Sequence, residues 1–410
     1  MPPISIAIFS LLLTTGCESI NTALNTAEQV ASSGTTKTLV EAATSKDPSA
    51  VLKHRVESYK TDPAAAIRDM KTVKGDFDRV MGALTGNVKK TWGKKEVKLP
   101  ERTKYIKYTQ NYRSRTIVDF DAGEITVETL DDKEPAGSLK NAIVTTLLTP
   151  DDPRAVDLFT DKNITLTSDR EPYLLGLVLD DHGQAVRTPA QADAFAGHLM
   201  DKQAGSRTVD VDGSQKPARY VTMTMVPNHE HKQAEKYRDL VGKFAQSYQI
   251  SPSLVFAIIR TESNFNPFAV SAAPAYGLMQ LVPASGGREA YRRAKGEDTM
   301  PSRDYLFNPE HNIELGAALL NVLVYNQLEP VSNTVSREYC VIAAYNTGSG
   351  NVFRVFSKDQ TTAVNEINRL HPGDLYETLR AKLPYEETRD YLYKVVNYRK
   401  EFVSISPSNE

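Results

Sequence analysis

The stretch SPSLVFAIIRTESNFNP, residues 251–267, decides the fold of the region around it. Its opening Ser-Pro pair predicts a helix start, because a Ser side chain accepts hydrogen bonds from free backbone N–H groups and Pro fits the first helical position. Val255, Ile258 and Ile259 then form the apolar stripe of a helix, and Glu262 continues that stripe one turn later. The pattern therefore places a carboxylate where a core side chain belongs.

A buried Glu262 has a specific chemical use. Burial disfavours the charged carboxylate, and so does a position near the C-terminal end of a helix, where the dipole is negative. Both effects raise its pKa. A carboxylic acid that is still protonated near neutral pH can act as a general acid and protonate a glycosidic oxygen. The alternative is a half-exposed Glu at a fraying helix end, and the motifs that follow Glu262 decide between the two.

Four short motifs come after Glu262 in a fixed order. They are Asn266-Pro267, then Ser271 ahead of the run AYGLMQ ending at Gln280, then AYN at 344–346, and finally PYEETRDY at 384–391. Each alone is an ordinary helix end or start, but together the order and spacing are specific. At these residues the chain resembles the soluble lytic transglycosylase family over about 235–402, which implies an all-α, goose-type lysozyme-like catalytic domain.

The resemblance also implies roles for individual residues. Glu262 becomes the catalytic acid and base of peptidoglycan strand cleavage. The expected substrate-binding residues are Ser263, Ser271, Met279, Gln280, Tyr345, Asn346, Glu387 and Tyr391. We expect the Tyr345 hydroxyl to hydrogen-bond the Glu262 carboxyl, and Gln280 and Asn346 to offer amides to the sugars. Met279 and Tyr276 would present apolar surface to the sugar rings, although the family usually has a smaller residue at the position of Tyr276.

A single catalytic carboxylate bears on the mechanism, because ordinary glycosidases use two. The resemblance implies that the substrate supplies the missing groups: its N-acetyl oxygen stabilises C1 and its C6 hydroxyl attacks, leaving a 1,6-anhydromuramoyl end. Two alternatives stay open, a lysozyme-type hydrolase acting on the same bond and a non-catalytic peptidoglycan-binding lipoprotein.

The N-terminus, MPPISIAIFSLLLTTGC, resembles a bacterial lipoprotein signal that ends at Cys17. Its apolar run is too short to span a bilayer, and a Ser/Thr/Asn/Ala-rich tether follows over 18–39. Two features depart from such signals: the first basic residue is Lys37, and Thr14 stands where Leu is usual. We expect lipidation of Cys17 and, because Glu18 rather than Asp follows it, anchoring in the outer membrane facing the periplasm. The alternative is a buried apolar terminus with a free Cys.

Residues 40–228 predict an α+β domain with one antiparallel sheet. Helical spacing covers 38–86 and 139–148, a hairpin joins 116–120 to 125–130, and 173–179 and 219–225 have the pattern of further strands. The Lys-rich stretch around Trp92 is interpreted as a solvated turn. A similar first domain precedes the catalytic one in membrane-bound relatives of this family.

Residues 229–410 predict helices only, over 235–249, 251–262, 312–327 and 336–345. The segment His229-Glu230-His231 at the junction is interpreted as a polar surface turn, so we expect the helical domain to fold and cut glycan without the first. No His/Cys cluster predicts a metal site, and no motif predicts a cofactor. The formal net charge of −2 gives no overall attraction to nucleic acid.

Overall fold

The computed structural model describes residues 63–166 and 170–404. The proposed leader ending at Cys17 and the tether over 18–39 lie outside them. The chain divides into two units, Met1–Asp76 and Phe77–Glu410, and helix α5 (Pro63–Trp92) belongs to both. All five strands and every described helix after α5 lie in the second unit. None of the helices among the described residues combines the length and the apolar character needed to cross a membrane.

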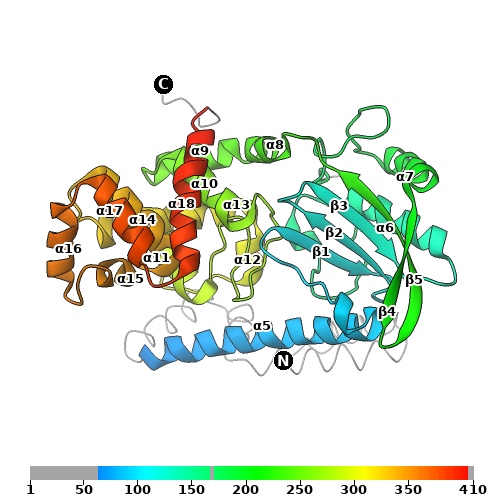
Figure 1. Ribbon diagram of the computed structural model, residues 1–410, viewed down its shortest axis with the longest axis horizontal. Coiled ribbons are helices and arrows are strands. Elements are labelled where there is room, and N and C mark those ends of the chain that lie inside the picture. The colour runs from blue at the N-terminus through cyan, green and yellow to red at the C-terminus, as the bar shows by residue number, and fades with distance from the viewer. Residues whose placement is uncertain (1–62, 167–169, 405–410) are drawn as a thin grey trace, which may run out of the picture. The chain divides into compact units, whose positions relative to one another are not determined.

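The first part of this unit is built on a five-stranded antiparallel sheet with strand order β1-β2-β3-β5-β4 (Figure 1). The strands are β1 (Lys104–Thr109), β2 (Ser114–Asp119), β3 (Glu124–Thr129), β4 (Gly205–Val211) and β5 (Ser214–Thr224). Helix α6 (Pro135–Leu147) packs across β2, β3 and β5, and α7 (Pro189–Gln203) packs on α6. In the sheet, Val118 is paired with Ile125 and Val127 with Val221, all four buried. The predicted hairpin, the helix over 139–148 and the strand over 219–225 are thereby confirmed.

Two predictions for this part are wrong. Residues 173–179 form turns and isolated bridges rather than a central strand, since Gly176 adopts a positive φ of 75° that interrupts extended backbone. Tyr173, Leu174, Leu177 and Val178 are buried all the same, whereas Leu179 is 37% exposed. The apolar run therefore indicates burial of most of its side chains but not strand geometry. Trp92 ends α5 fully buried, with the Arg115 guanidinium 3.8 Å from its ring centre, and only the lysines around it face solvent.

The second part is helical, as predicted, and the two-part fold class is confirmed. Its helices are α8 (His229–Lys236), α9 (Arg238–Ser247), α10 (Pro252–Ser263), α11 (Arg288–Lys295), α12 (Arg303–Phe307), α13 (Pro309–Val322), α14 (Thr334–Thr347), α15 (Ser349–Arg354), α16 (Gln360–Arg369), α17 (Pro372–Lys382) and α18 (Glu386–Glu401), with π-helical turns η3 (Pro283–Gly287) and η4 (Leu323–Gln327). Helix α10 contacts α9 and α18, and α14 buries the free thiol of Cys340, whose pKa burial raises to about 12.

One apolar core runs through both parts. The Phe268 ring packs between Tyr105 and Tyr173 of the sheet part, with ring centres 4.6 and 5.1 Å away. His229 is buried at the start of α8, and its Nε2 lies 3.0 Å from the Phe120 carbonyl oxygen, so the prediction of a surface turn at His229 is wrong. His229 is buried because the start of α8 packs against the end of β2. The polar sequence of this segment does not predict that contact.

Candidate active site

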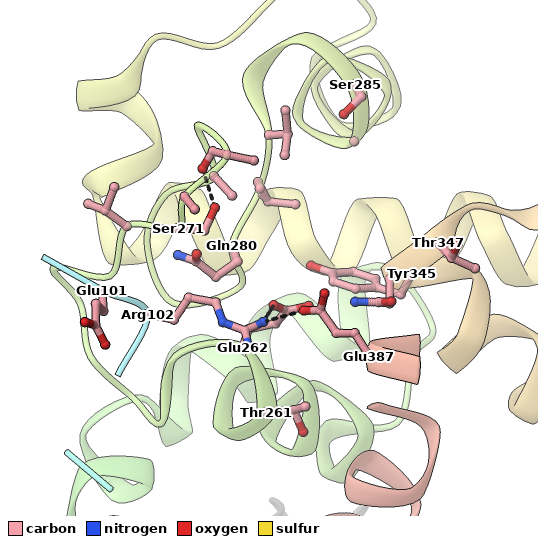
Figure 2. A pocket seen from close by; sticks show the side chains of 18 of the residues that line it. Glu101, Arg102, Thr261, Glu262, Ser271, Gln280, Ser285, Tyr345, Thr347 and Glu387 are labelled. Carbon is pink, nitrogen blue, oxygen red and sulfur yellow. Dashed lines mark hydrogen bonds and ion pairs between the residues drawn. The ribbon is translucent and has the colours of Figure 1, made fainter. Parts of the chain in front are cut away.

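A cavity of about 1440 Å³ lies between elements of the sheet part and the helical part, and Glu262 lines it (Figure 2). One side is formed by α5 from Phe77 onward and by the segment 99–103 ahead of β1. The other side comes from the end of α10, the loop after it, η3, α13, the end of α14 and α18. The cavity therefore needs residues from both parts of the unit.

Helix α10 presents Glu262 in its last turn. The helix begins at Pro252 as predicted, but Ser251 does not cap it, because its hydroxyl pairs with that of Ser253 at 2.9 Å instead. It ends because Asn264 takes a left-handed conformation, with φ and ψ both 46°, while its Nδ2 donates to the Phe120 carbonyl oxygen at 2.8 Å. Glu262 is 6% exposed, as the helical pattern predicted.

Burial is the main reason why the pKa of Glu262 rises from 4.5 to about 7. The nearest cation is Arg102, with Nη1 3.8 Å from Glu262 Oε2; it lowers this pKa, as does Tyr391, while the Glu387 charge raises it. The carboxyl group is thus largely protonated below neutral pH. That is the state in which it can donate a proton to a leaving oxygen.

Two tyrosines, Tyr345 and Tyr391, lie next to Glu262. The Tyr345 hydroxyl donates to the Met279 carbonyl oxygen at 3.0 Å, so the predicted hydrogen bond from Tyr345 to Glu262 is wrong. Tyr391 faces the carboxyl instead, without a hydrogen bond of ordinary geometry. Burial and the Glu262 charge raise the pKa of both phenols well above their usual range, so both keep their protons.

Five of the eight expected substrate-binding residues line the cavity: Ser271, Gln280, Tyr345, Asn346 and Glu387. Ser263 is fully buried, and its hydroxyl donates to the Leu278 carbonyl oxygen at 2.8 Å. Tyr391 is also buried, behind Glu262. Neither residue lines the cavity.

Met279 and Tyr276 point into the core, so the expectation that they face sugar rings is wrong. Gly277, with φ of 76°, turns the chain where an added Cβ would meet Asn312 Nδ2 at 2.5 Å. The Met279 backbone N–H then donates to Asn312 Oδ1 at 2.8 Å. This tight turn directs Met279 inward and leaves Gln280 on the cavity side.

Gln280 is held in one orientation. Its Nε2 donates to the Ala269 and Gly277 carbonyl oxygens, at 3.1 and 2.9 Å. No donor among the described residues reaches its buried Oε1. Because both amide hydrogens are engaged, Gln280 can only accept a hydrogen bond from a bound molecule. Asn346 is the opposite case: its Oδ1 accepts from Thr388 Oγ1 at 2.6 Å, which leaves its NH2 group as the donor.

The cavity also contains residues of the first part that were not predicted from the sequence. Asp78, Met81, Gly82 and Thr85 come from α5, and Glu101 and Arg102 from the segment ahead of β1. None belongs to a motif, and Arg102 stands 160 positions before Glu262. Only the tertiary fold brings these residues to the acid.

The described residues offer one group that could hold a metal ion, Asp180, Asp181 and His182, whose ligand atoms lie within 4.8 Å of one another. This loop does not line the cavity. Asp180 Oδ1 accepts the backbone N–H groups of His182 and Gln184, at 2.9 and 2.8 Å, so turn formation accounts for its position.

Two family models match this chain, one in each part. Residues 68–236 match the N-terminal domain of membrane-bound lytic murein transglycosylase C, and 239–368 match the transglycosylase SLT domain. Solved structures similar to this chain include an inactive mutant of lytic transglycosylase Slt from Pseudomonas aeruginosa (29% identity, TM-score 0.33) and the 70 kDa soluble lytic transglycosylase from Escherichia coli (26%, 0.31). Each match covers 42% of this chain, and 25% and 26% of those chains.

Curated relatives match over most of their length. The chain is 43% identical over 326 residues to membrane-bound lytic murein transglycosylase C of Edwardsiella ictaluri (strain 93-146), covering 80% of this chain and 89% of that protein. For the protein of that name from Cronobacter sakazakii (strain ATCC BAA-894), the identity is 46% over 319 residues, covering 78% and 87%. Identity and coverage of this extent show that the chain belongs to the membrane-bound lytic murein transglycosylase C family.

Proposed function

We propose that this protein cleaves the β-1,4 bond between N-acetylmuramic acid and N-acetylglucosamine in peptidoglycan and leaves a 1,6-anhydromuramoyl end. The observation that carries the proposal is Glu262, a buried acid with a pKa of about 7 that lines a large cavity. The names of the relatives, which are murein transglycosylases, supply the substrate class.

The proposed reaction uses one carboxyl group twice, first as an acid and then as a base. Glu262 protonates the glycosidic oxygen as the bond from that oxygen to C1 breaks, and the substrate's N-acetyl oxygen stabilises C1. The Glu262 carboxylate then takes the proton of the C6 hydroxyl, whose oxygen bonds to C1, so the acid is restored without water entering. Gln280 Oε1 would accept a hydrogen bond from an N–H or O–H group of the sugar.

A hydrolase remains the second candidate because Glu387 is another carboxylate at the cavity. Ordinary glycosidases place a second carboxylate to act on water or to form a covalent intermediate. Here Arg102 Nη1 lies 3.3 Å from Glu387 Oε1 and 3.8 Å from Glu262 Oε2, so Glu387 is ion-paired with a guanidinium that also contacts Glu262. That arrangement favours the one-acid mechanism.

Mass spectrometry of fragments released from purified cell wall tests the proposal. We expect muramic ends that are lighter by one water than a reducing sugar. Fragments that carry mainly reducing ends would replace the proposal with hydrolysis by Glu262 and Glu387.

Gly82 tests whether glycan occupies the cavity. It lines the cavity from α5, and no atom lies within 4 Å of the Cβ that a larger residue would add. We expect Gly82→Leu to lower kcat/KM on glycan strands by about tenfold, the loss that one displaced contact in a binding cleft produces. Stability should be kept or raised, since Gly costs about 1 kcal/mol in a helix.

Gly86 supplies the matched control. It lies one turn further along α5, is exposed, has equal space around its Cβ position and does not line the cavity. Gly86→Leu should leave kcat/KM unchanged in the same assay. Equal losses in both variants would mean that the helix, not the cavity, is responsible.

For location, we propose that a lipid on Cys17 holds the protein on the periplasmic face of the outer membrane. The relatives are named membrane-bound, and the apolar leader, Gly16-Cys17 and Glu18 support this route. Cys17→Ala is expected to move the protein into the soluble fraction when expressed from its own leader. Retention in the membrane fraction, with no acyl mass on the N-terminal peptide of the unaltered protein, would contradict it.

A further inference from the structure

Arg102 reaches Glu262 from a segment that is fixed on both sides. The Arg102 carbonyl oxygen accepts from Asn266 Nδ2 at 3.0 Å, in the loop just after α10. On the sheet side, the backbone N–H of Phe120 donates to the Thr103 carbonyl oxygen at 2.9 Å, and that of Glu101 donates to the Lys104 carbonyl oxygen at 3.0 Å. The position of Arg102 is thus built into the fold.

Figure 2 shows the Arg102 guanidinium next to the carboxyl groups of Glu262 and Glu387. Glu262 is the buried one, with a side chain only 8% exposed, whereas the Glu387 side chain is 68% exposed. The same Nη1 atom lies 3.3 Å from Glu387 and 3.8 Å from Glu262. Arg102 therefore interacts with Glu262, but its closer contact is with Glu387.

We propose that Arg102 and Glu387 are positioning residues of the reaction: the Arg102 charge stabilises the carboxylate that Glu262 becomes after donating its proton, and Glu387 restrains that charge. This inference rests on the proposed role of Glu262 as general acid. Under this proposal the sheet part of the unit takes part in the reaction, because Arg102 comes from that part and forms an ion pair with Glu262.

Among the described residues, the other titratable groups near Glu262 are neutral or form no ion pair with it. Tyr345 of α14 and Tyr391 of α18 face it as neutral phenols. In the described ranges, Arg102 alone forms an ion pair with Glu262. The remaining charged residues at the cavity are Asp78, Glu101, Asp121, Arg260, Glu289 and Lys394.

The expected effects have opposite signs. A cation favours the charged form of a carboxyl group, so loss of Arg102 raises the pKa of Glu262 above about 7, and loss of the Glu387 charge lowers it. Because the first step needs protonated Glu262, kcat/KM falls as pH rises through that pKa. Arg102→Gln should shift this decline upward by about half a pH unit or more, and Glu387→Gln should shift it downward. The upward shift comes with a lower plateau, since a weaker acid donates its proton more slowly.

The experiment is the pH profile of kcat/KM on glycan strands for both single variants and the double variant. If Glu387 acts by restraining Arg102, its substitution shifts the profile less when Arg102 is already Gln. Arg102→Lys keeps the charge and should bring the decline back toward its original pH. Arg113→Gln removes a cation that has a 44% exposed side chain, is paired with Asp131 and lies away from the cavity, and this substitution should not shift the profile.

Lost rate with an unmoved profile, or shifts in the same direction for both variants, would overturn the inference. Thermal unfolding of each variant identifies damage to the fold. Product masses from the same samples separate this test from the proposed function: reducing ends with the predicted shifts would keep the Arg102–Glu387 pair and discard the transglycosylase mechanism.

Discussion

Glu262→Gln is expected to lower glycan cleavage by at least about a thousandfold, which is within the range for removal of a general acid and base. The amide has the shape of the carboxyl group but no proton to give and no basic oxygen, so both steps fail. Binding of peptidoglycan fragments should persist, because the remaining cavity residues are unchanged. Cleavage assays paired with fragment binding to the same sample measure both, and a variant that still cuts would remove Glu262 from the mechanism.

The same substitution should change stability in a pH-dependent way. The pKa of Glu262 is about 7 in the folded protein, against 4.5 when unfolded, so the folded state binds the extra proton between these pH values. Stability of the unaltered protein therefore falls as pH rises from 4.5 to 7, by roughly 3 kcal/mol at most.

Glu262→Gln has no such proton to lose. Its unfolding free energy should match that of the unaltered protein near pH 4 and exceed it at pH 8. Denaturant unfolding at the two pH values measures the difference. A constant difference would show that the carboxyl group is not buried in solution.

Residues 229–410 expressed alone are expected to lose activity and much of their stability, contrary to what the polar sequence at the junction predicts. The fragment would expose Phe268, which packs on Tyr105 and Tyr173, and each such aromatic pair contributes about 1 kcal/mol beyond its burial. It would also lose Arg102 and the Phe120 carbonyl oxygen that Asn264 and His229 contact.

A side-by-side measurement of fragment and full chain decides this. Circular dichroism and thermal unfolding report the fold, and release of soluble glycan reports activity. A fragment that folds cooperatively and cuts at the full-length rate would show that the shared core is dispensable.

Sequence reasoning succeeded where the signal is local. The i, i+3, i+4, i+7 pattern predicted the buried position of Glu262, and alternation predicted the hairpin that became β2 and β3. It failed where a side chain's direction depends on a turn or on a distant segment. Local periodicity does not predict the turn at Gly277, which directs Met279 into the core. It also does not predict that Arg102 of the sheet part contacts Glu262.

The buried thiol of Cys340 has a practical consequence for spectroscopy. A fully buried cysteine with a pKa of about 12 presents almost no thiolate, so maleimide or iodoacetamide reagents should pass it by while the fold is intact. In a form of the protein without Cys17, a cysteine introduced in place of exposed Gly86 would be the site of attachment for a fluorophore or spin label. Such a probe would lie on α5, one turn from Gly82, which lines the cavity.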